Sequence, residues 1–281
     1  MGISQYIKEI GRGPRGSKPL TREQAADLFG QLLDGNVTDL EIGAFCLAMR
    51  IKGETPEEMC GFLDAAHSRM ALFPASDRPV IVLPSYNGAR KLPVLTPLLA
   101  LLLAREGLPV LLHGMRTEAR RTLASDVLLA LGVPALTAPE KIATGSVAHI
   151  ETGYLHAALA RLLKVREVVG LRNAGHSIVK LMNPCAGPAV VVTSYTHPEY
   201  YDMLQATFGA LHMTALLSRG LEGEVATDPR RTPRYDAFVA GVHQLLQEQQ
   251  PGTAADVPGP PTEIDTDTTA PHTQDVLARR P

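Results

Sequence analysis

The sequence has few cysteines, no long apolar run and no excess of basic charge. Cys46, Cys60 and Cys185 are far apart and odd in number, which argues against a disulfide framework or a zinc site and favours small buried side chains. The longest apolar run, residues 95–104, contains Pro97 and is about half the ~20 residues that cross a bilayer. We expect no membrane span. Because the first residues lack a signal-peptide pattern, we also expect a cytoplasmic protein.

The formal net charge is −2, whereas domains that bind nucleic acid are often strongly basic. The basic residues are nevertheless grouped along the chain, and each group has only one acidic residue near it. Each group could simply be a solvated face. The three groups are Lys8, Arg12, Arg15 and Lys18 with Glu9; Arg116, Arg120 and Arg121 with Glu118; and Arg161, Lys164, Arg166, Arg172 and Lys180 with Glu167.

Helix signals dominate residues 1–75, for which we predict a helical N-terminal domain. A short helix is expected over 3–10. Thr21 with Gln24 forms a capping box, Thr38 or Asp39 begins the next helix, and Thr55-Pro56 begins a fourth helix that runs to about Ala71. The glycines that follow these stretches are typical helix ends.

Residues 76–250 alternate short apolar runs with helical patterns, which predicts an α/β domain with a mixed, mostly parallel sheet flanked by helices. We expect strands at 80–83, 110–112, 168–171, 190–193 and 214–217, and helices at 96–106, 122–131, 155–163, 198–208 and 235–249. From Pro251 the composition is rich in Pro, Thr, Asp and Ala without a period, so residues 251–281 are predicted to be a disordered acidic tail.

The turn at residues 84–91 lies between a strand and a helix, where α/β proteins commonly bind phosphate. A loop that holds pyrophosphate needs several glycines, because backbone N–H groups must approach the anion closely. This turn has only Gly88, followed by Arg90 and Lys91. Asn87-Gly88 could be no more than a tight turn. The two cations nevertheless favour attraction of an anion without the geometry that phosphoryl chemistry requires.

His113 invites an acid–base role, because imidazole titrates near neutral pH. At a strand end followed by Gly114, a hydrogen-bonded structural role is the stronger interpretation. His176 and His197 have no carboxylate or cysteine at ligand spacing. No nucleophile-elbow pattern supports a Ser–His–Asp triad.

Most of residues 20–225 resembles the anthranilate phosphoribosyltransferase family, which is glycosyltransferase family 3. This resemblance implies the family's phosphoribosyltransferase-like (nucleoside phosphorylase) fold. The matching stretches occur in the family's order. They are 20–66, including Asp39-Leu40-Glu41-Ile42-Gly43-Ala44 and Arg50-Ile51-Lys52-Gly53-Glu54-Thr55; His113-Gly114-Met115-Arg116; 124–132; and Arg172 through Asn183-Pro184.

The departures from the family are concentrated in the chemistry. The family's Gly-Thr-Gly-Gly-Asp loop is replaced by Pro84-Ser85-Tyr86-Asn87-Gly88, and its acceptor-contacting Asn is replaced by Met115. The adjacent Asp-Glu pair that holds magnesium becomes Glu222-Gly223-Glu224. Because a glycine separates them, the two carboxylates point in different directions. Because the family continues with helices at the point where this chain becomes Pro251-Gly252-Thr253, we also expect a shortened C-terminal lobe.

This combination resembles the YbiB branch of the family, whose members bind DNA or RNA without sequence preference as homodimers. The resemblance implies a homodimer through the N-terminal helices, no catalysis and no cofactor. The alternative is an active, magnesium-dependent phosphoribosyltransferase that uses phosphoribosyl pyrophosphate, with Glu222 and Glu224 as weak metal candidates. Because counterion release depends on how many phosphates are neutralised, scattered cations suffice for a polyanion.

The expected site residues fall into two sets. A vestigial phosphoribosyl site comprises Ser85, Asn87, Gly88, His113 and Gly114. The nucleic-acid site combines cations with Tyr86, and with Tyr195, as stacking platforms. Its cations are Lys8, Arg12, Arg15, Lys18, Lys52, Arg90, Lys91, Arg116, Arg120, Arg121, Arg172 and Lys180.

Overall fold

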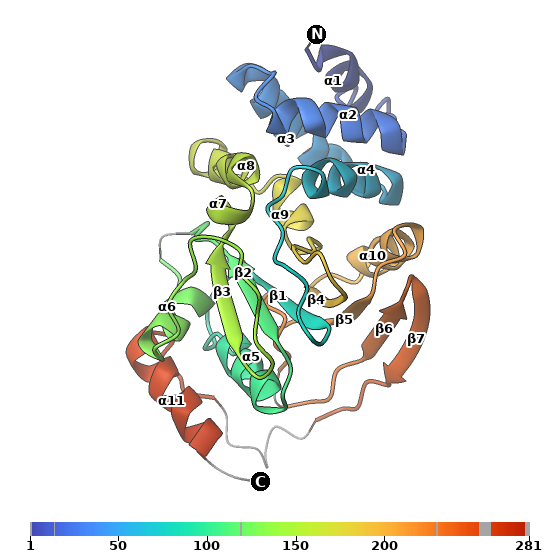
Figure 1. Cartoon of the computed structure of the whole chain (residues 1–281). Helices are drawn as coiled ribbons and strands as arrows, with labels where there is room; N and C mark the ends of the chain where they lie inside the picture. Colours follow the sequence, from blue (N-terminus) through green and yellow to red (C-terminus); the bar gives the residue numbers. More distant parts are fainter. Residues whose placement is uncertain (1, 14, 119, 229, 253–259, 279–281) are drawn as a thin grey trace.

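A computed structural model describes all residues except 1, 14, 119, 229, 253–259 and 279–281. A group of N-terminal helices lies above a seven-stranded sheet (Figure 1). None of the described helices has both the length and the apolar content needed to span a bilayer.

Four helices form the N-terminal part, and three of them begin at the capping boxes that the sequence contains. The side-chain oxygens of Thr21, Thr38 and Thr55 each accept a hydrogen bond from the backbone N–H three residues later, which satisfies an otherwise unpaired helix donor. The predicted helices are confirmed, although the fourth ends at His67 rather than near residue 71. They are α1 (Ser4–Ile10), α2 (Arg22–Leu33), α3 (Asp39–Lys52) and α4 (Pro56–His67).

A cluster of three buried phenylalanines holds α2, α3 and α4 together. The ring centroids of Phe29 and Phe62 are 5.0 Å apart, and Phe45 meets Phe62 edge-on at 5.9 Å. All three side chains are fully buried. Each contributes about 1.5–3 kcal/mol through burial, so this cluster sets the packing of the helical part.

The sheet has the strand order β3-β2-β1-β4-β5-β6-β7. β1 to β5 pair in parallel, and β5-β6 and β6-β7 pair antiparallel. The predicted fold class, an α/β fold with a mixed, mostly parallel sheet, is confirmed. The strands are β1 (Val80–Ser85), β2 (Val110–Gly114), β3 (Val147–Glu151), β4 (Ala189–Tyr195), β5 (Ala215–Arg219), β6 (Tyr235–Val239) and β7 (Val242–Gln247).

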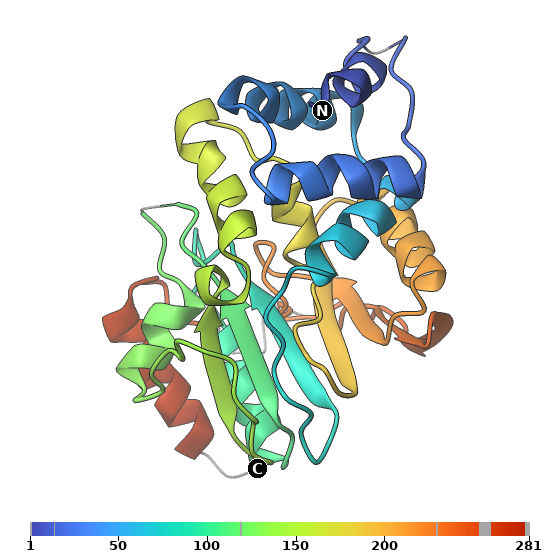
Figure 2. The same ribbon diagram turned by 45° about the horizontal axis from the view of Figure 1, so that its top comes forward.

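The other helices lie in two places (Figures 1 and 2). One group packs together beside the first strands: α5 (Thr96–Arg105), α6 (Ala124–Ala130) and α11 (Thr266–Ala278). The second group lies between the sheet and the N-terminal helices, where α8 contacts α2, and α9 and α10 contact α4. It comprises α7 (Thr152–Leu155), α8 (Ala157–Val169), α9 (Gly175–Ile178) and α10 (Glu199–Ala210).

The helix predicted over 235–249 is wrong, because this segment forms the β6–β7 hairpin. Val239 pairs with Val242 across a two-residue loop. Both loop residues have positive φ, 49° at Ala240 and 80° at Gly241, as a type I′ turn requires. Alanine is uncommon in that conformation, so Ala240-Gly241 gave no hairpin signal.

Three further expectations differ from the structure. The predicted strand at 168–171 is instead the end of α8, which stops where Gly170 adopts φ 75°. β3 was not predicted. The tail that was expected to be disordered contains α11. Its Ala270 is buried against an apolar cluster that includes Val127 and Leu128 of α6. Tertiary packing therefore orders a segment whose own helical pattern is weak. Residues 253–259 and 279–281 of that tail lie outside the described residues.

Candidate functional site

The candidate site lies at the edge of the sheet where β1 and β2 end. Ser85 pairs with Gly114 in the parallel ladder, so the turn after β1 and the loop after β2 leave the sheet together. This is the edge at which open α/β sheets bind ligands. A Cβ at position 114 would collide with the Ser85 carbonyl oxygen, so the close pairing requires glycine there.

Gly88 gives the turn its shape. Its φ is 66°, a left-handed conformation that favours glycine. A Cβ at this position would lie 2.7 Å from the Thr122 carbonyl oxygen, to which Ala89 N–H donates at 2.8 Å. Asn87-Gly88 is therefore a tight turn, and it packs against the loop that follows β2.

Tyr86 is not a stacking platform, contrary to expectation. Its ring is buried, and its hydroxyl lies 2.8 Å from His113 Nδ1 and 2.9 Å from Thr152 Oγ1. Burial raises the pKa of Tyr86 and lowers the pKa of His113 to about 3. His113 is fully buried and neutral near pH 7, as a structural role requires.

The Glu224 carboxylate occupies the concave side of the turn. It accepts hydrogen bonds from Asn87 N–H at 2.8 Å and from Gly88 N–H at 2.9 Å. The hydroxyls of Ser85 and Thr96 donate to its other oxygen at 2.6 and 2.9 Å. Glu224 is buried, and four donors satisfy its charge, as a buried carboxylate requires.

Glu222 caps the next part of the same turn. Its carboxylate accepts from the backbone N–H groups of Arg90 at 2.8 Å, Lys91 at 3.0 Å and Leu92 at 3.3 Å. Glu222 has a φ of 54°, which is unusual for a residue with a side chain. Such strained backbone persists only where surrounding contacts over-determine it.

These contacts decide how a magnesium–phosphoribosyl pyrophosphate complex fits. The N–H groups and hydroxyls that would face a pyrophosphate already donate to the chain's own carboxylates. The same two carboxylates, Glu222 and Glu224, were the metal candidates. The residues therefore do not fit this complex.

Six of the twelve expected phosphate contacts are paired within the protein, among them Lys52, Arg116 and Lys180. Lys52 forms a buried ion pair with Glu58 at 2.6 Å, and Arg116 contacts Asp126 at 2.6 Å. Lys180 donates to the Gly223 carbonyl oxygen at 2.9 Å, and burial lowers its pKa to about 8. Lys52 is the clearest correction, because its removal from Glu58 would leave a buried charge unpaired.

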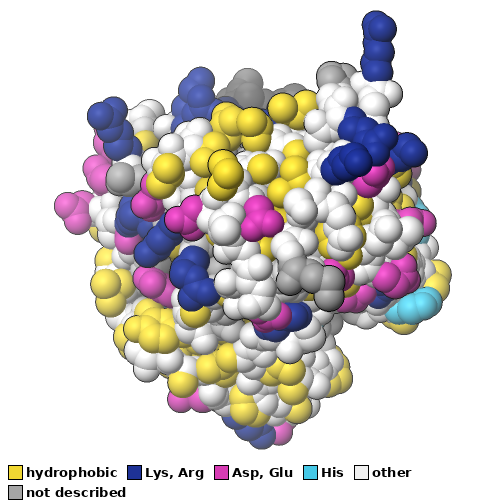
Figure 3. Space-filling model, turned by 90° about the horizontal axis from the view of Figure 1, so that it is seen from above, with side chains coloured by type: hydrophobic (Ala, Val, Ile, Leu, Met, Phe, Trp, Pro, Cys, Tyr) yellow, Lys and Arg dark blue, Asp and Glu magenta, His cyan; other side chains and the backbone are white. Residues whose placement is uncertain are grey.

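Seven further expected cations are exposed but do not lie in one place, and one of them, Arg12, forms an ion pair with Glu9 at 2.7 Å. Lys8, Arg12, Arg15 and Lys18 lie on α1 and the segment after it, at the far end of the helical part (Figure 1). Arg90, Lys91 and Arg120 lie beside the sheet edge. Viewed from above, Lys and Arg side chains form separate groups among acidic and apolar ones (Figure 3).

Arg121 and Arg172 belong to a basic cluster around one carboxylate. Both contact the carboxylate of Glu118, and Arg166 of α8 does so as well. The distances to its oxygens are 2.8 Å for Arg121, 2.7 Å for Arg166 and 3.4 Å for Arg172. Burial and the neighbouring Arg166 lower the pKa of Arg172. Arg166 belongs to one of the basic groups in the sequence, but it was not among the expected nucleic-acid-binding residues.

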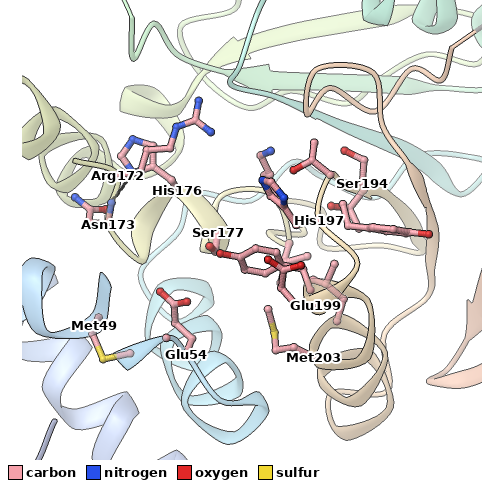
Figure 4. A pocket seen from close by; sticks show the side chains of 18 of the residues that line it. Met49, Glu54, Arg172, Asn173, His176, Ser177, Ser194, His197, Glu199 and Met203 are labelled. Atoms are coloured by element: carbon pink, nitrogen blue, oxygen red, sulfur yellow. Dashed lines mark hydrogen bonds between the residues drawn. The ribbon is translucent and has the colours of Figure 1, made fainter. Parts of the chain in front are cut away.

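A cavity of about 390 Å³ adjoins this cluster. Figure 4 shows Arg172 and His176 on one side and Ser194, His197 and Glu199 on the other. The pKa of His176 is lowered to about 3, chiefly by burial and further by the positive charge of Arg172. Tyr195 at the end of β4 also lines the cavity, and its half-buried ring packs edge-on against Tyr201, with the ring centroids 5.4 Å apart. The end of α3 closes the cavity from the helical side with Met49, Arg50, Gly53 and Glu54.

Sequence reasoning missed the role of the carboxylates. Glu222 and Glu224 are 130 or more residues from the turn that they cap, and no local spacing relates them to it. Glu118 was counted only as a charge that offsets its neighbours. For Glu118 the available signal was its position among three arginines.

Comparisons with known proteins agree with this fold. Residues 4–70 match the family model "Glycosyl transferase family, helical bundle domain". The chain is 38% identical over 257 residues to the uncharacterized protein YbiB of Escherichia coli (strain K12), covering 89% of this chain and 80% of that protein. It is 31% identical to anthranilate phosphoribosyltransferase of Methylorubrum extorquens (strain PA1), covering 75% and 65%.

Solved structures of anthranilate phosphoribosyltransferases have the same fold as this chain. Anthranilate phosphoribosyltransferase from Thermus thermophilus matches with a TM-score of 0.74 at 21% identity, over 98% of this chain and 82% of that one. The Saccharomyces cerevisiae enzyme in complex with PRPP and Mg matches with a TM-score of 0.66 at 13% identity, over 98% and 80%. At these identities the likeness establishes the fold alone.

Proposed function

The chain belongs to the glycosyltransferase family 3 group that includes YbiB and the anthranilate phosphoribosyltransferases, and from this premise we propose that it binds nucleic acid without sequence preference and catalyses no transfer. The observation that supports the absence of catalysis is the turn filled by Glu222 and Glu224. Phosphoribosyl transfer requires preorganised donors for the pyrophosphate. Here those donors serve the protein's own carboxylates.

Cations at the same edge of the sheet support polyanion binding. Arg90, Lys91 and Arg120 are exposed, and the Arg121–Arg166–Arg172 cluster lies beside the cavity. Neutralising phosphates releases counterions whatever the base sequence. The protein would act in the cytoplasm, where nucleic acid is available to it.

We further propose a homodimer formed through the N-terminal helices. The outer face of α3 exposes Leu40, Leu47 and Ile51, and the end of α8 exposes Val168 and Leu171. Leu40 is 84% exposed and Val168 is 89% exposed. Apolar side chains gather on this side of the molecule (Figure 3), and exposed apolar patches of this kind mark contact surfaces.

The test of nucleic-acid binding is a titration of fluorescent single- and double-stranded oligonucleotides of several sequences at increasing salt. We expect similar affinities for all sequences and a linear fall of log affinity with log salt. Reversing the charges of Arg90 and Lys91 together should weaken binding to every sequence about equally. Affinity that is weak at low salt, or independent of salt, would contradict the proposal.

The relatives favour a second candidate, an active magnesium-dependent phosphoribosyltransferase. It is supported by 31% identity to the Methylorubrum extorquens enzyme. Release of pyrophosphate from phosphoribosyl pyrophosphate, measured with magnesium and anthranilate, separates the two candidates. Turnover at an ordinary enzymatic rate, on the order of 1–10³ per second, would favour the transferase.

A further inference from the structure

Three arginine side chains from separate segments converge on one carboxylate beside the turn. Arg121 follows β2, Arg166 lies on α8, and Arg172 follows that helix. Arg121 and Arg166 contact different oxygens of Glu118, at 2.8 and 2.7 Å, and Arg172 shares the oxygen of Arg166 at 3.4 Å. Tertiary structure therefore assembles a site that local sequence spacing does not indicate.

The cluster has more positive charge than its carboxylate can balance. Three guanidinium groups carry three positive charges, against the single negative charge of Glu118. Among the described residues, Arg166 Nη1 is buried without a hydrogen-bond partner. A buried donor without a partner is costly, and like charges held together repel. Both features favour an anion with more acceptor positions than one carboxylate offers.

We infer that Arg121, Arg166 and Arg172 bind one phosphate group, and that Glu118 occupies the position of that group when it is absent. A phosphodiester has two charged non-bridging oxygens and two weaker ester acceptors in tetrahedral array, so it can accept from guanidinium groups that arrive from different directions better than one planar carboxylate can. The inference rests on the proposed function, because it takes this group to be a phosphodiester of a bound nucleic acid. A free phosphate has the same chemistry.

The position of the cluster makes it accessible to a strand at the sheet edge. Arg172 lines the cavity, and its side chain is 34% exposed. Arg121 Nη1 donates to the Asn87 carbonyl oxygen at 3.0 Å, which fixes the cluster against the closed turn. A phosphate held here would lie close to the exposed Arg120, from which an extended polyanion could continue.

The experiment compares Arg166→Gln and Glu118→Gln with Arg78→Gln. Arg78 precedes β1 and contacts the Gly107 carbonyl oxygen at the opposite end of the sheet, so it is a matched control. Inorganic phosphate is titrated by calorimetry, and a fluorescent single-stranded oligonucleotide is titrated by anisotropy at several salt concentrations. Circular dichroism and thermal melts establish that each variant is folded.

We expect Arg166→Gln to weaken the binding of both probes about tenfold or more and to reduce the oligonucleotide salt slope by about one. Glu118→Gln should strengthen both about tenfold, because it removes the competing carboxylate. Arg78→Gln should change neither. If Arg166→Gln does not fold, Arg172→Gln takes its place, because the Arg172 side chain is more exposed than that of Arg166.

Two results would overturn the inference: phosphate affinity equal in Arg166→Gln and Arg78→Gln, or Glu118→Gln binding phosphate more weakly than the unaltered protein. If the proposed nucleic-acid binding is wrong, the result is different, because neither the unaltered protein nor any variant would then bind the oligonucleotide. Phosphate titrations would still decide whether the arginines form an anion site.

Discussion

At the scale of single residues, the turn depends on backbone conformation more than on side-chain charge. Arg90 and Lys91 suggested an anion site because of their side chains, yet their backbone N–H groups make the observed contacts with Glu222. Tyr86 shows the limit of sequence reasoning here. Its residue type suits either stacking or burial, and only the neighbouring Thr152 and His113 hold its hydroxyl inside.

Gly88→Ala should lower the free energy of unfolding by about 1–3 kcal/mol, because alanine is strained at positive φ and its Cβ would approach the Thr122 carbonyl oxygen. Urea unfolding measures the change. Gly153→Ala in α7 is the control, since a Cβ there meets nothing within 4 Å and alanine favours helix by about 0.5–1 kcal/mol. Equal stability of the two variants would contradict this account of the turn.

At the scale of elements, helix starts could be predicted and the sheet only partly. Thr21, Thr38 and Thr55 carry local capping signals, and each begins a helix. The β6–β7 hairpin was missed, because Ala240 adopts a backbone conformation that its residue type does not suggest. Likewise, the closure of the turn could not be predicted, since it joins segments that meet only after the sheet has formed.

Replacing Glu222 and Glu224 together by alanine should open the turn to anions. The released donors would be unsatisfied, so we expect a loss of about 1–3 kcal/mol for the buried Glu224 alone. Pyrophosphate should restore stability in this variant by occupying the donors, with a gain of about 2.7 kcal/mol at one hundred times its dissociation constant.

Thermal melts with and without pyrophosphate measure this rescue. The unaltered protein and Glu140→Ala, a change at an exposed carboxylate, should respond much less. A pyrophosphate response that is the same in all three proteins would show that the carboxylates do not occupy an anion site.

At the scale of the whole molecule, buried histidines make stability depend on pH. Burial lowers the pKa of His113 and of His176 to about 3, below the unfolded value of about 6.5. Their contribution is fully present above pH 6.5. As pH falls from 6.5 towards 3, the unfolded state binds protons that the folded state does not, so stability declines by up to ~1.4 kcal/mol per pH unit for each histidine.

Urea unfolding between pH 7.5 and 5 tests this dependence. His113→Gln should make the decline shallower, because it removes one of the titrating groups. His243→Gln changes a histidine that pairs with Asp236 on the far hairpin and should not reproduce that effect. An unchanged slope in His113→Gln would contradict the assignment.

The oligomeric state is a second property of the whole molecule. Leu47→Asp combined with Ile51→Asp places two charges on the exposed face of α3 and should convert a dimer to a monomer in analytical ultracentrifugation. Leu246→Asp on β7, also at an exposed leucine, should leave the dimer intact. A monomer before any substitution would refute the proposed interface.

The position of α11 has a practical consequence. This helix packs beside α5 and α6, and Arg105 Nη1 donates to the Leu277 carbonyl oxygen, on the side of the sheet away from the N-terminal helices (Figure 1). A dye or surface tether attached after it would therefore leave both α3 and the arginine cluster unobstructed. Immobilised in this orientation, the molecule would present its candidate contact faces to the solution.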